Sequence, residues 1–332
     1  MQTLLLILAA ITAATFMFAD VTSSTASSGG YVSIPAAVRD FYSKEVFFFA
    51  QPRCRFIQFA KVKRDLQAVR GKAIVFTKYG NLSGRSKLFE TDPLVPEGMS
   101  TSEVTIAVYE HAKAISVTEL LLKTSMLDVL GDASKLLANH LAIDLDYEFR
   151  DIALSTANTV YGNSRLTANT LVNNDGLTTA TVKDAIEILE KNNAPKYVRN
   201  DGEFYVCIAH PHQLRQLRDD PNWINANVYN GTVLLYKGEV GMYEGCIFVS
   251  TTNMPEMTNA ETILKYGAGY TATNGWEAVF FGENAFAWAI ALDVEMRDDG
   301  VVEFGRKHSL AYYGIWGSGI IEGKNIVKAL TA

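Results

Sequence analysis

The sequence has few cysteines and no excess of basic residues, and both shortages exclude classes of protein. Its three cysteines, Cys54, Cys207 and Cys246, are odd in number and widely spaced. This spacing argues against a disulfide framework and suits a reducing compartment. Lysine and arginine total 30 against 36 acidic residues, which gives a formal net charge of −6. Because a nucleic-acid reader carries a basic footprint, the charge does not indicate that class.

The sequence also lacks the common short motifs of catalysis. It contains no glycine fingerprint for dinucleotides, no phosphate-binding loop ending in Gly-Lys-Ser or Gly-Lys-Thr, and no histidine pair at metalloprotease spacing. A Gly-x-Ser-x-Gly elbow is missing as well, and no 20–50-residue repeat is present. We therefore expect no catalytic residues, no cofactor-binding residues and no metal ligands.

Two small groups of residues could still carry chemistry. His210 and His212 flank Pro211 three residues after Cys207, and such a set could hold a metal. The group fits a corner between a strand and a helix better, because Cys207 falls in an apolar run and proline is common at helix starts.

The paired acidic residues favour structural roles. Asp144 and Asp146 are two apart on a predicted helix, so they point to different faces. Asp219 and Asp220 precede Pro221 and are typical of a turn that ends a helix.

The chain is globular by composition, with 48% hydrophobic and 20% charged residues over 332 positions, enough for one large domain or two. We expect its longest helix from Asp132 to Thr156, with Asp132 as the N-cap. The apolar residues that recur at every fourth position of this segment are Leu137, Leu141, Leu145, Phe149 and Ala153.

Other elements follow from periodicity and turn residues. Helices are expected at residues 35–48, 117–130, 178–193 and 211–218, and an extended segment at 52–59. Strands are expected at residues 72–79, 103–109, 204–209, 246–249, 276–280, 286–292, 301–304 and 310–321, with a tight turn at 298–300. The unbroken apolar run at 204–209 is typical of a strand covered on both faces.

The first residues are apolar, and three interpretations remain open. Leu4–Ala19 is too short for a span of about 20 residues. It resembles the core of a secretory signal, although the first basic residue is Arg39 and a signal carries lysine or arginine before its core. The alternatives are initiation at Met17 or an apolar arm that packs on a neighbour. Residues 21–30 form a small, polar linker, and folded sequence begins near Ile34.

A basic segment surrounds the first predicted strand. It is followed by a glycine- and proline-containing loop of some twenty residues, long for a compact domain. One interpretation is a solvated face, and the other is an extension over residues 61–100 that is drawn to an acidic surface of another subunit and buries little of its own. The candidates for intersubunit contact are Lys63, Arg64, Arg70, Lys78, Arg85 and Lys87.

The order of these elements resembles the major capsid proteins of tailed bacteriophages, of the Hong Kong 97 type. The similarity to the group found in N4-like short-tailed phages lies in short stretches spread between Ile34 and Ile321. These stretches are Gly71-Lys72, Pro96-Glu97-Gly98-Met99, Ala142-Ile143-Asp144-Leu145-Asp146, His210-Pro211, Leu217-Arg218-Asp219-Asp220 and Gly238 to Gly245. The apolar first sixteen residues depart from the group.

The resemblance implies an α+β fold with a set order of parts. The expected parts are an apolar leader and linker (1–33), an N-terminal arm (34–60), an extended β-loop (61–100), a peripheral domain with a long spine helix (101–175), an inserted axial α/β domain (176–262) and a return to the peripheral sheet (263–332).

The resemblance also implies function and partners. It implies a structural, non-enzymatic coat protein that self-assembles as hexamers and pentamers into an icosahedral shell around double-stranded DNA, with no sequence-specific DNA contact and no membrane. A separate scaffolding protein is expected, because the segment before Ile34 is too short for a fused one. A portal and decoration proteins are further partners. The expected location of the protein is the virion capsid, which is assembled in the host bacterial cytoplasm. The alternatives are an encapsulin-like bacterial compartment and, from the N-terminal run alone, a secreted enzyme.

Overall fold

The computed structural model describes residues 55–65, 71–80, 82, 96–125, 128–199, 202–223, 239–267 and 269–332. Within this part the chain forms two compact units. The first comprises Ala112–His140 and Val294–Tyr313, and the second comprises the described residues of Gln51–His111 together with Leu141–Asp293 and Gly314–Ala332. The predicted leader (1–33), the predicted helix at 35–48 and Cys54 lie outside the described residues.

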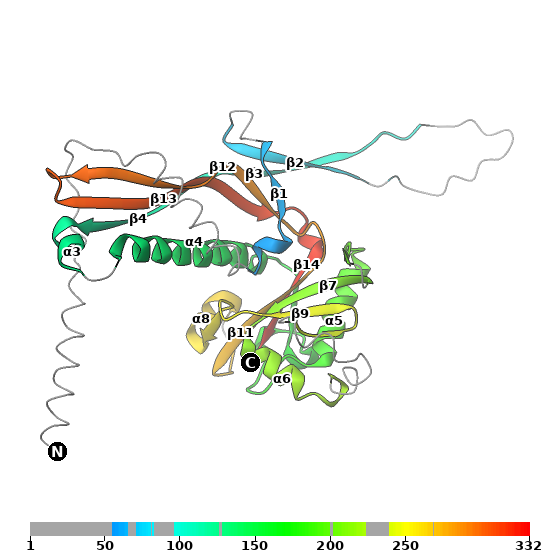
Figure 1. Ribbon diagram of the computed structural model, residues 1–332. Helices are drawn as coiled ribbons and strands as arrows, with labels where there is room; N and C mark the ends of the chain where they lie inside the picture. Colours follow the sequence, from blue (N-terminus) through cyan, green and yellow to red (C-terminus); the bar gives the residue numbers. More distant parts are fainter. Residues whose placement is uncertain are drawn as a thin grey trace, which may run out of the picture. The chain divides into compact units, whose positions relative to one another are not determined.

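The second unit contains an eight-stranded mixed sheet, ordered β5-β14-β11-β7-β9-β8, with β10 paired to β11 and β6 paired to β7 (Figure 1). The pairs β5–β14 and β7–β9 are parallel, whereas β7–β11 and β11–β14 are antiparallel. Its strands are β5 (Thr159–Tyr161), β6 (Tyr197–Arg199), β7 (Gly202–Ala209), β8 (Glu239–Tyr243), β9 (Cys246–Ser250), β10 (Glu256–Thr258), β11 (Asn274–Phe281) and β14 (Ile326–Thr331).

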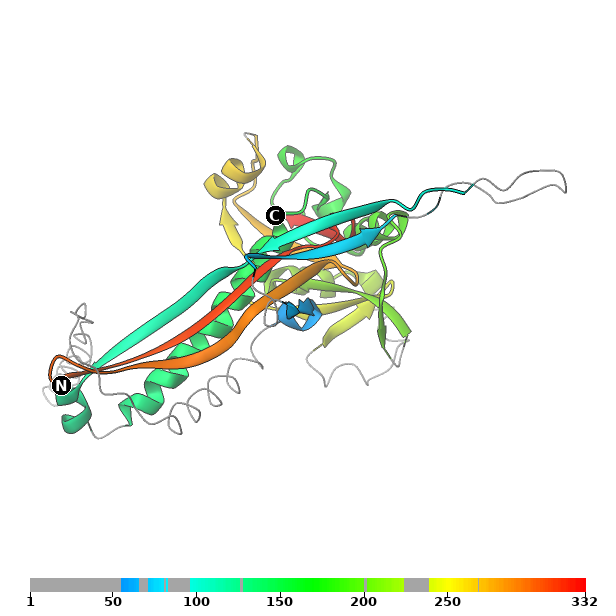
Figure 2. The ribbon, with the colours of Figure 1, turned by 90° about the horizontal axis from the view of Figure 1, so that it is seen from above.

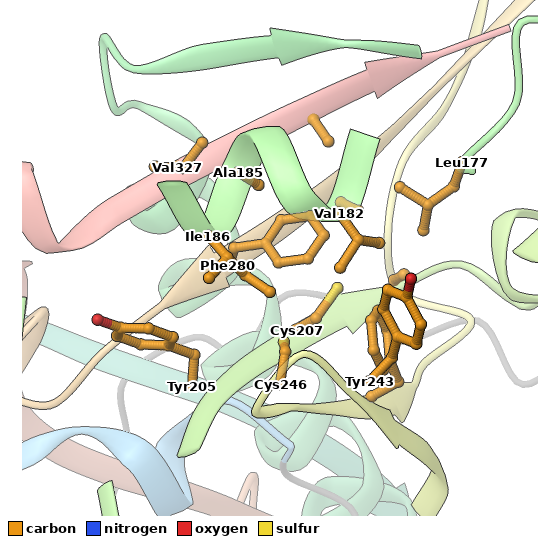
Figure 3. Close-up of a cluster of buried hydrophobic side chains, with 14 of the residues drawn as sticks. Leu177, Val182, Ala185, Ile186, Tyr205, Cys207, Tyr243, Cys246, Phe280 and Val327 are labelled. Carbon is orange, nitrogen blue, oxygen red and sulfur yellow. The ribbon is translucent and has the colours of Figure 1, made fainter. Parts of the chain in front are cut away.

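Both faces of this sheet are buried. Along β7, Tyr205 and Cys207 enter one hydrophobic core, and Val206 and Ile208 enter the other. Because successive side chains of a strand point to opposite faces, a strand buried on both sides is expected to be apolar on both of them. The prediction of a doubly covered strand at 204–209 is confirmed. Figure 3 shows one of the two cores, with Cys207 among its labelled residues.

Three helices of the second unit pack on the sheet, and each begins at a side-chain cap. The helix α5 (Thr179–Lys191) is capped by Thr178, and α6 (Pro211–Arg218) and α8 (Asn259–Tyr266) begin with capping boxes. Their bounds confirm the helices predicted at 178–193 and 211–218. Short 3₁₀ helices lie at Ile57–Phe59, Gly162–Ser164, Ala168–Thr170 and Gly323–Asn325. The 3₁₀ helix at Ile57–Phe59 lies where the end of an extended segment was expected, at 52–59.

The longest helix is α4 (Val129–Leu154), which has 26 residues. The predicted stripe is confirmed, because the five apolar residues at every fourth position are all buried. The predicted N-cap at Asp132 is wrong. The helix begins three residues earlier, where Asp128 accepts a hydrogen bond from the Gly131 amide at 3.1 Å, so an internal glycine was mistaken for a boundary. No helix within the described ranges is long and apolar enough to cross a membrane.

A four-stranded sheet has the order β1-β12-β13-β4, and three of its strands continue through both units. Its members are β1 (Lys61–Lys63), β4 (Tyr109–Thr118), β12 (Phe286–Val302) and β13 (Lys307–Ile320). The predicted helix at 117–130 is wrong, because β4 runs through Thr118 and α3 (Glu119–Thr124) has only six residues. The strand expected at 103–109 includes only the first residue of β4, so the sequence did not predict the remainder of this strand.

The tight turn predicted at 298–300 is also wrong. Residues 298–300 lie inside β12, where the Gly300 amide donates to Asp298 Oδ1 at 2.9 Å and Gly300 takes a positive φ of 75°. This local irregularity uses turn residues without reversing the chain. The reversal falls instead at Glu303 and Phe304, in the segment expected to be a strand.

The extension is built on a two-stranded antiparallel sheet of β2 (Ala73–Tyr79) and β3 (Thr101–Ala107), which lie side by side in both views (Figures 1 and 2). Its root is buried within its own chain. Ile74, Phe76 and Ile106 form a cluster with Ala287, Ala289 and Ile321. The expectation that the extension buries little in its own subunit is therefore wrong for the root.

Two glycines of β13 allow the root to lie close. A methyl group on Gly317 would lie 2.0 Å from the carbonyl oxygen of Ala107, and one on Gly319 would lie 2.9 Å from Ile106. The first clash is with backbone, which cannot rotate away. Glycine at these positions thus permits a strand-to-strand approach that any side chain would prevent.

A buried carboxylate fixes the connection between β5 and α5. Asp175 accepts hydrogen bonds from the Val172 amide at 3.0 Å, from Arg165 Nε at 2.9 Å and from Asn163 Nδ2 at 3.2 Å. Burial alone would raise the pKa of Asp175, but these hydrogen bonds and the Arg165 charge outweigh it and lower the pKa below its usual value. The ionised form therefore stabilises the fold at neutral pH.

We expect Asp175→Asn to lower the free energy of unfolding at pH 7 by about 1–3 kcal/mol, the cost of a lost charged hydrogen-bond acceptor. A depressed pKa contributes stability above the unfolded value of about 3.9, and this contribution is lost as pH falls through the lower folded value. The variant should therefore lose less stability than the parent between pH 5 and pH 2. Urea unfolding at several pH values measures this, with the partly exposed Asp144→Asn as control. Equal acid slopes for parent and variant would contradict the assignment.

We expect Gly317→Ala to lower subunit stability by about 1–3 kcal/mol, because the added methyl forces the strands apart in a packed root. Thermal unfolding of the purified subunit measures the loss. Gly98→Ala is the matched control, since a methyl there meets nothing within 4 Å. Unchanged stability in Gly317→Ala would show that the root is not closely packed.

Candidate functional site

The candidate contact residues divide into two sets. Lys63, Arg64 and Lys78 lie at the described root of the extension. Arg70, Arg85 and Lys87 lie outside the described residues. The structure therefore brings the first three to one region and leaves the second three as predictions.

Each described candidate has a partner in its own chain. Lys78 Nζ lies 3.0 Å from Glu322 Oε2, and Arg64 Nη2 lies 3.5 Å from Asp293 Oδ1. Lys63 Nζ lies 3.1 Å from Asp65 Oδ2 and donates to the Val75 carbonyl at 2.9 Å. These ion pairs are partly exposed, so each stabilises the root only weakly.

Apolar side chains dominate the described distal part of the extension. Tyr79, Leu82 and Met99 are 67%, 71% and 69% exposed. The ladder that carries them is closed at this end by a hydrogen bond from the Gly80 amide to the Ser100 carbonyl at 2.8 Å. Single exposed apolar residues are ordinary, but a group on one protruding ribbon is typical of an interaction surface.

A second candidate is the point where the N-terminal segment enters the described fold. Asp146, on α4, is buried, and its Oδ1 accepts from the Arg55 amide at 3.0 Å and the Phe56 amide at 3.3 Å. Its Oδ2 accepts from Asn253 Nδ2 at 2.7 Å. Phe56 is itself buried in the core that contains Phe149 of the same helix. One carboxylate thus holds the first described residues, α4 and the segment after β9 together.

A third polar cluster links α4 to β13 and β4. Glu148 accepts from Trp316 Nε1 at 2.8 Å and from the Ser318 hydroxyl. The Trp316 ring stacks on His111 with centroids 4.2 Å apart and planes 9° apart. Buried polar groups need partners, and Trp316 satisfies its only donor through this contact.

The histidine and cysteine group is the strand-to-helix corner that was predicted. His210 caps α6, and its Nδ1 accepts from the His212 amide at 3.2 Å. Burial lowers the pKa of His210, which favours the neutral ring that such an acceptor requires. His212 stacks on Trp276, and Cys207 is a buried free thiol. Among the described residues no group of three or more potential ligands could hold a metal.

The paired carboxylates also have structural roles. Asp144 and Asp146 lie on different faces of α4, the first partly exposed and the second buried. Asp219 is the C-cap of α6, and Asp220 accepts from the Thr179 amide at 3.0 Å. The predicted helix-ending turn is confirmed.

The sequence contained signals for the residues that were missed. Asp146 lies four residues after Ala142 and three before Phe149, both buried, so helical spacing already put it beside the apolar stripe. Leu82 and Met99 stand beside glycine, proline and polar residues, at positions that no predicted helix or strand buries. The contact surface was predicted here from the charged residues of the segment, although its exposed apolar residues are the stronger indication of such a surface.

Several solved structures have the same fold. The capsid of Ralstonia phage GP4 aligns with a TM-score of 0.70 and 15% identity, covering 95% of this chain and 96% of that one. The cyanophage Pam1 capsid gives 0.62 at 16% identity, with coverage of 94% and 97%. A virus-like particle from Pyrococcus furiosus gives 0.52 at 13% identity, with coverage of 88% and 99%. A comparison with curated proteins found no match.

Sequence comparison agrees with these structures. The family described as phage capsid protein matches residues 148–314, half of the chain. The match begins inside α4, includes the strands of the mixed sheet except β14, and ends inside β13. The expectation of a phage coat protein is therefore confirmed at the level of family, and with it a structural role in the virion: this chain belongs to the phage capsid protein family.

Proposed function

We propose that this chain is the major capsid protein of a tailed phage, with a coat-protein fold of the Hong Kong 97 type. The observation that carries the proposal is an extension that is rooted in its own subunit and exposes apolar side chains beyond the root. Such a feature costs solubility in a monomer and becomes adhesive when another subunit covers it. The N4-like short-tailed phages are the group that the sequence motifs favour.

The proposed parts follow the expected order. Residues 34–60 are the arm, 61–100 the extended loop, 101–175 the peripheral domain with α4 as spine helix, 176–262 the axial domain and 263–332 the return. The strands β11 and β14 of the last segment join the sheet that contains β7 and β9. The boundary at residue 262 therefore divides the sequence and not the sheet.

The extension lies over a neighbouring subunit in this proposal. Its described distal residues support apolar contact as the main attraction, because Lys63, Arg64 and Lys78 already have partners in their own chain. These three, with Arg70, Arg85 and Lys87, supply a secondary attraction that weakens with salt, since exposed charges are screened beyond about 8 Å at 0.15 M ionic strength.

The shell is proposed to consist of hexamers and pentamers and to enclose double-stranded DNA without reading its sequence. A net charge of −6 supports this, because DNA affinity depends mainly on lysine and arginine that neutralise phosphates. The proposed partners are a separate scaffolding protein, a portal and decoration proteins, and the proposed place of assembly is the host cytoplasm. An encapsulin-like compartment is less favoured, since the phage capsids give higher TM-scores than the Pyrococcus furiosus particle.

We expect the purified chain to form closed shells, alone or with a scaffolding protein from the same phage. Electron microscopy of the assemblies measures their size and regularity, and nuclease-protected nucleic acid reports the content. A chain that stays monomeric at high concentration, with and without scaffold, would contradict the proposal. Small shells that carry a cargo enzyme and no portal would favour the compartment.

We expect Tyr79→Ser, Leu82→Ser and Met99→Ser together to leave a folded subunit but to lower shell yield roughly tenfold or more, since interface energy concentrates in apolar anchors. Circular dichroism and sedimentation on one preparation measure both effects. The matched control is Leu166→Ser, Val198→Ser and Leu264→Ser, which replaces apolar residues elsewhere that are even more exposed. Equal yields from the two triple variants would remove the special role of the extension.

A further inference from the structure

The corner between β7 and α6 depends on an imidazole that acts as a hydrogen-bond acceptor. His210 follows the last residue of β7, and its Nδ1 accepts from the His212 amide in the first turn of α6 at 3.2 Å. A neutral imidazole has one nitrogen that accepts and one that donates, so the proton of this ring is on Nε2. Serine, threonine, asparagine and aspartate are the usual residues at this position, and they keep their acceptor between pH 5 and pH 8. Histidine does not.

The first turn of α6 connects three strands of the mixed sheet. Gln213 is fully buried, and its Oε1 accepts from the His210 amide, directly after β7, at 3.2 Å. Its Nε2 donates to the Trp276 carbonyl of β11 at 3.2 Å and to Thr331 Oγ1 of β14 at 2.8 Å. Because buried polar groups need their partners, these contacts require that the first turn keeps its shape. The position of Gln213 therefore depends on the cap that His210 provides.

The remainder of α6 closes the hydrophobic core on one face of the sheet. Leu214 and Leu217 are buried in this core together with Cys207 of β7 and Cys246 of β9. Both thiols are free and fully buried, and Figure 3 shows them among the apolar side chains of the core. Movement of α6 away from the sheet would therefore expose leucine side chains and give solvent access to two cysteines.

The surroundings of His210 favour the uncharged ring. Burial has the largest influence and lowers the pKa of His210, and the neighbouring His212 of α6 lowers it further. Glu256 of β10 acts in the opposite direction, but its carboxylate is exposed and does not outweigh burial. Among the described residues, His212 and Glu256 are the titratable groups that act on the ring. The helix itself also opposes a charged cap, because the first turn of a helix carries a partial positive charge.

We propose that His210 is an acid-sensitive switch, which holds α6 against the mixed sheet only while its ring is neutral. Protonation gives both ring nitrogens a hydrogen, so that Nδ1 changes from acceptor to donor and faces the donating His212 amide. The cap is then lost, the first turn opens, and Gln213 leaves its partners on β11 and β14. The helix thereby loosens from the core, and it returns when the pH is raised.

The direction of the pH effect follows from the lowered pKa of His210. A group whose pKa is lower in the folded protein stabilises the fold above its unfolded value, which is about 6.5 for histidine. This contribution is lost as the pH falls from that value through the lower folded value. The switch therefore acts between neutral and mildly acidic pH, above the range in which the Asp175 carboxylate is protonated.

The first experiment measures hydrogen exchange of the α6 amides in the full-length chain at pH 7 and pH 5, corrected for intrinsic exchange. His210→Asn is the test variant, because asparagine caps helices at either pH and carries Oδ1 at the place of the imidazole Nδ1. Protection of residues 211–218 should fall in the parent by up to about tenfold per pH unit, the limit for one proton. It should not fall in His210→Asn. Equal losses in the two chains would overturn the proposal.

The control for this experiment removes the neighbouring titratable group. His212→Phe keeps an aromatic ring against Trp276, on which the imidazole stacks with centroids 4.1 Å apart. This variant should retain the acid response of the parent, because its His210 is unchanged. An acid response that is lost in His212→Phe and kept in His210→Asn would assign the switch to the wrong histidine and overturn the proposal.

The second experiment tests whether the whole helix loosens. In a Cys54→Ser background the remaining cysteines are Cys207 and Cys246, and their reaction with a small pyridyl disulfide is followed at pH 7 and pH 5. At pH 5 both thiols should react faster in this background than in the same chain with His210→Asn, and at pH 7 the two chains should react equally. Comparison at one pH cancels the intrinsic effect of pH on thiol reactivity. Equal rates at pH 5 would confine the change to the first turn and overturn the release of α6 from the core.

Discussion

Burial of the mixed sheet on both faces is the constraint from which most of the second unit follows. Alternate side chains of β7 and β11 enter two separate cores, so neither strand has a face left for solvent. Helices α5 and α6 close one side, and Phe149 of α4 with Phe56 and Phe286 closes the other. The part of α4 that belongs to this unit, which contains Phe149, is therefore positioned by the core on that face of the sheet.

Because α4 is fixed in this way, its polar residues can act as anchors for other segments. Asp146 binds the first described residues, and Glu148 binds Trp316 of β13. A buried polar group left without a partner is costly, and this applies to the Asp146 carboxylate and to the indole N–H of buried Trp316, so each contact favours one placement of the segment it holds. The extension is positioned by a different means, the close approach that Gly317 and Gly319 allow. Segments are therefore held to α4 by hydrogen bonds, whereas the root of the extension is positioned by close packing against β13.

Helices and strands were predicted correctly from the sequence where one hydrophobic pattern dominated. The fourfold spacing along α4 and the unbroken apolar run of β7 each permit only one interpretation, and both predictions were confirmed.

Prediction from the sequence failed where local residue preferences conflict with tertiary pairing. The segment 109–118 shows no strict alternation of apolar and polar residues. It forms the strand β4 because it pairs with β13. Asp298 and Gly300 carry turn chemistry inside a long strand, whereas the true reversal uses glutamate and phenylalanine, which local propensity does not favour. The ion pairs of the candidate contact residues could not be predicted either, because charge is visible in a sequence while the partner of Lys78, Glu322, lies 244 positions away.

The Asp146 contact has a mechanical consequence. Two successive backbone amides, those of Arg55 and Phe56, are bound to one carboxylate in the second half of a 26-residue helix. A pull on Arg55 would therefore load α4 through the Asp146 carboxylate and the sheet through the buried Phe56 side chain. Because the polar and the apolar contact are made by adjacent residues, both would have to break together before Arg55 and Phe56 could detach from the second unit.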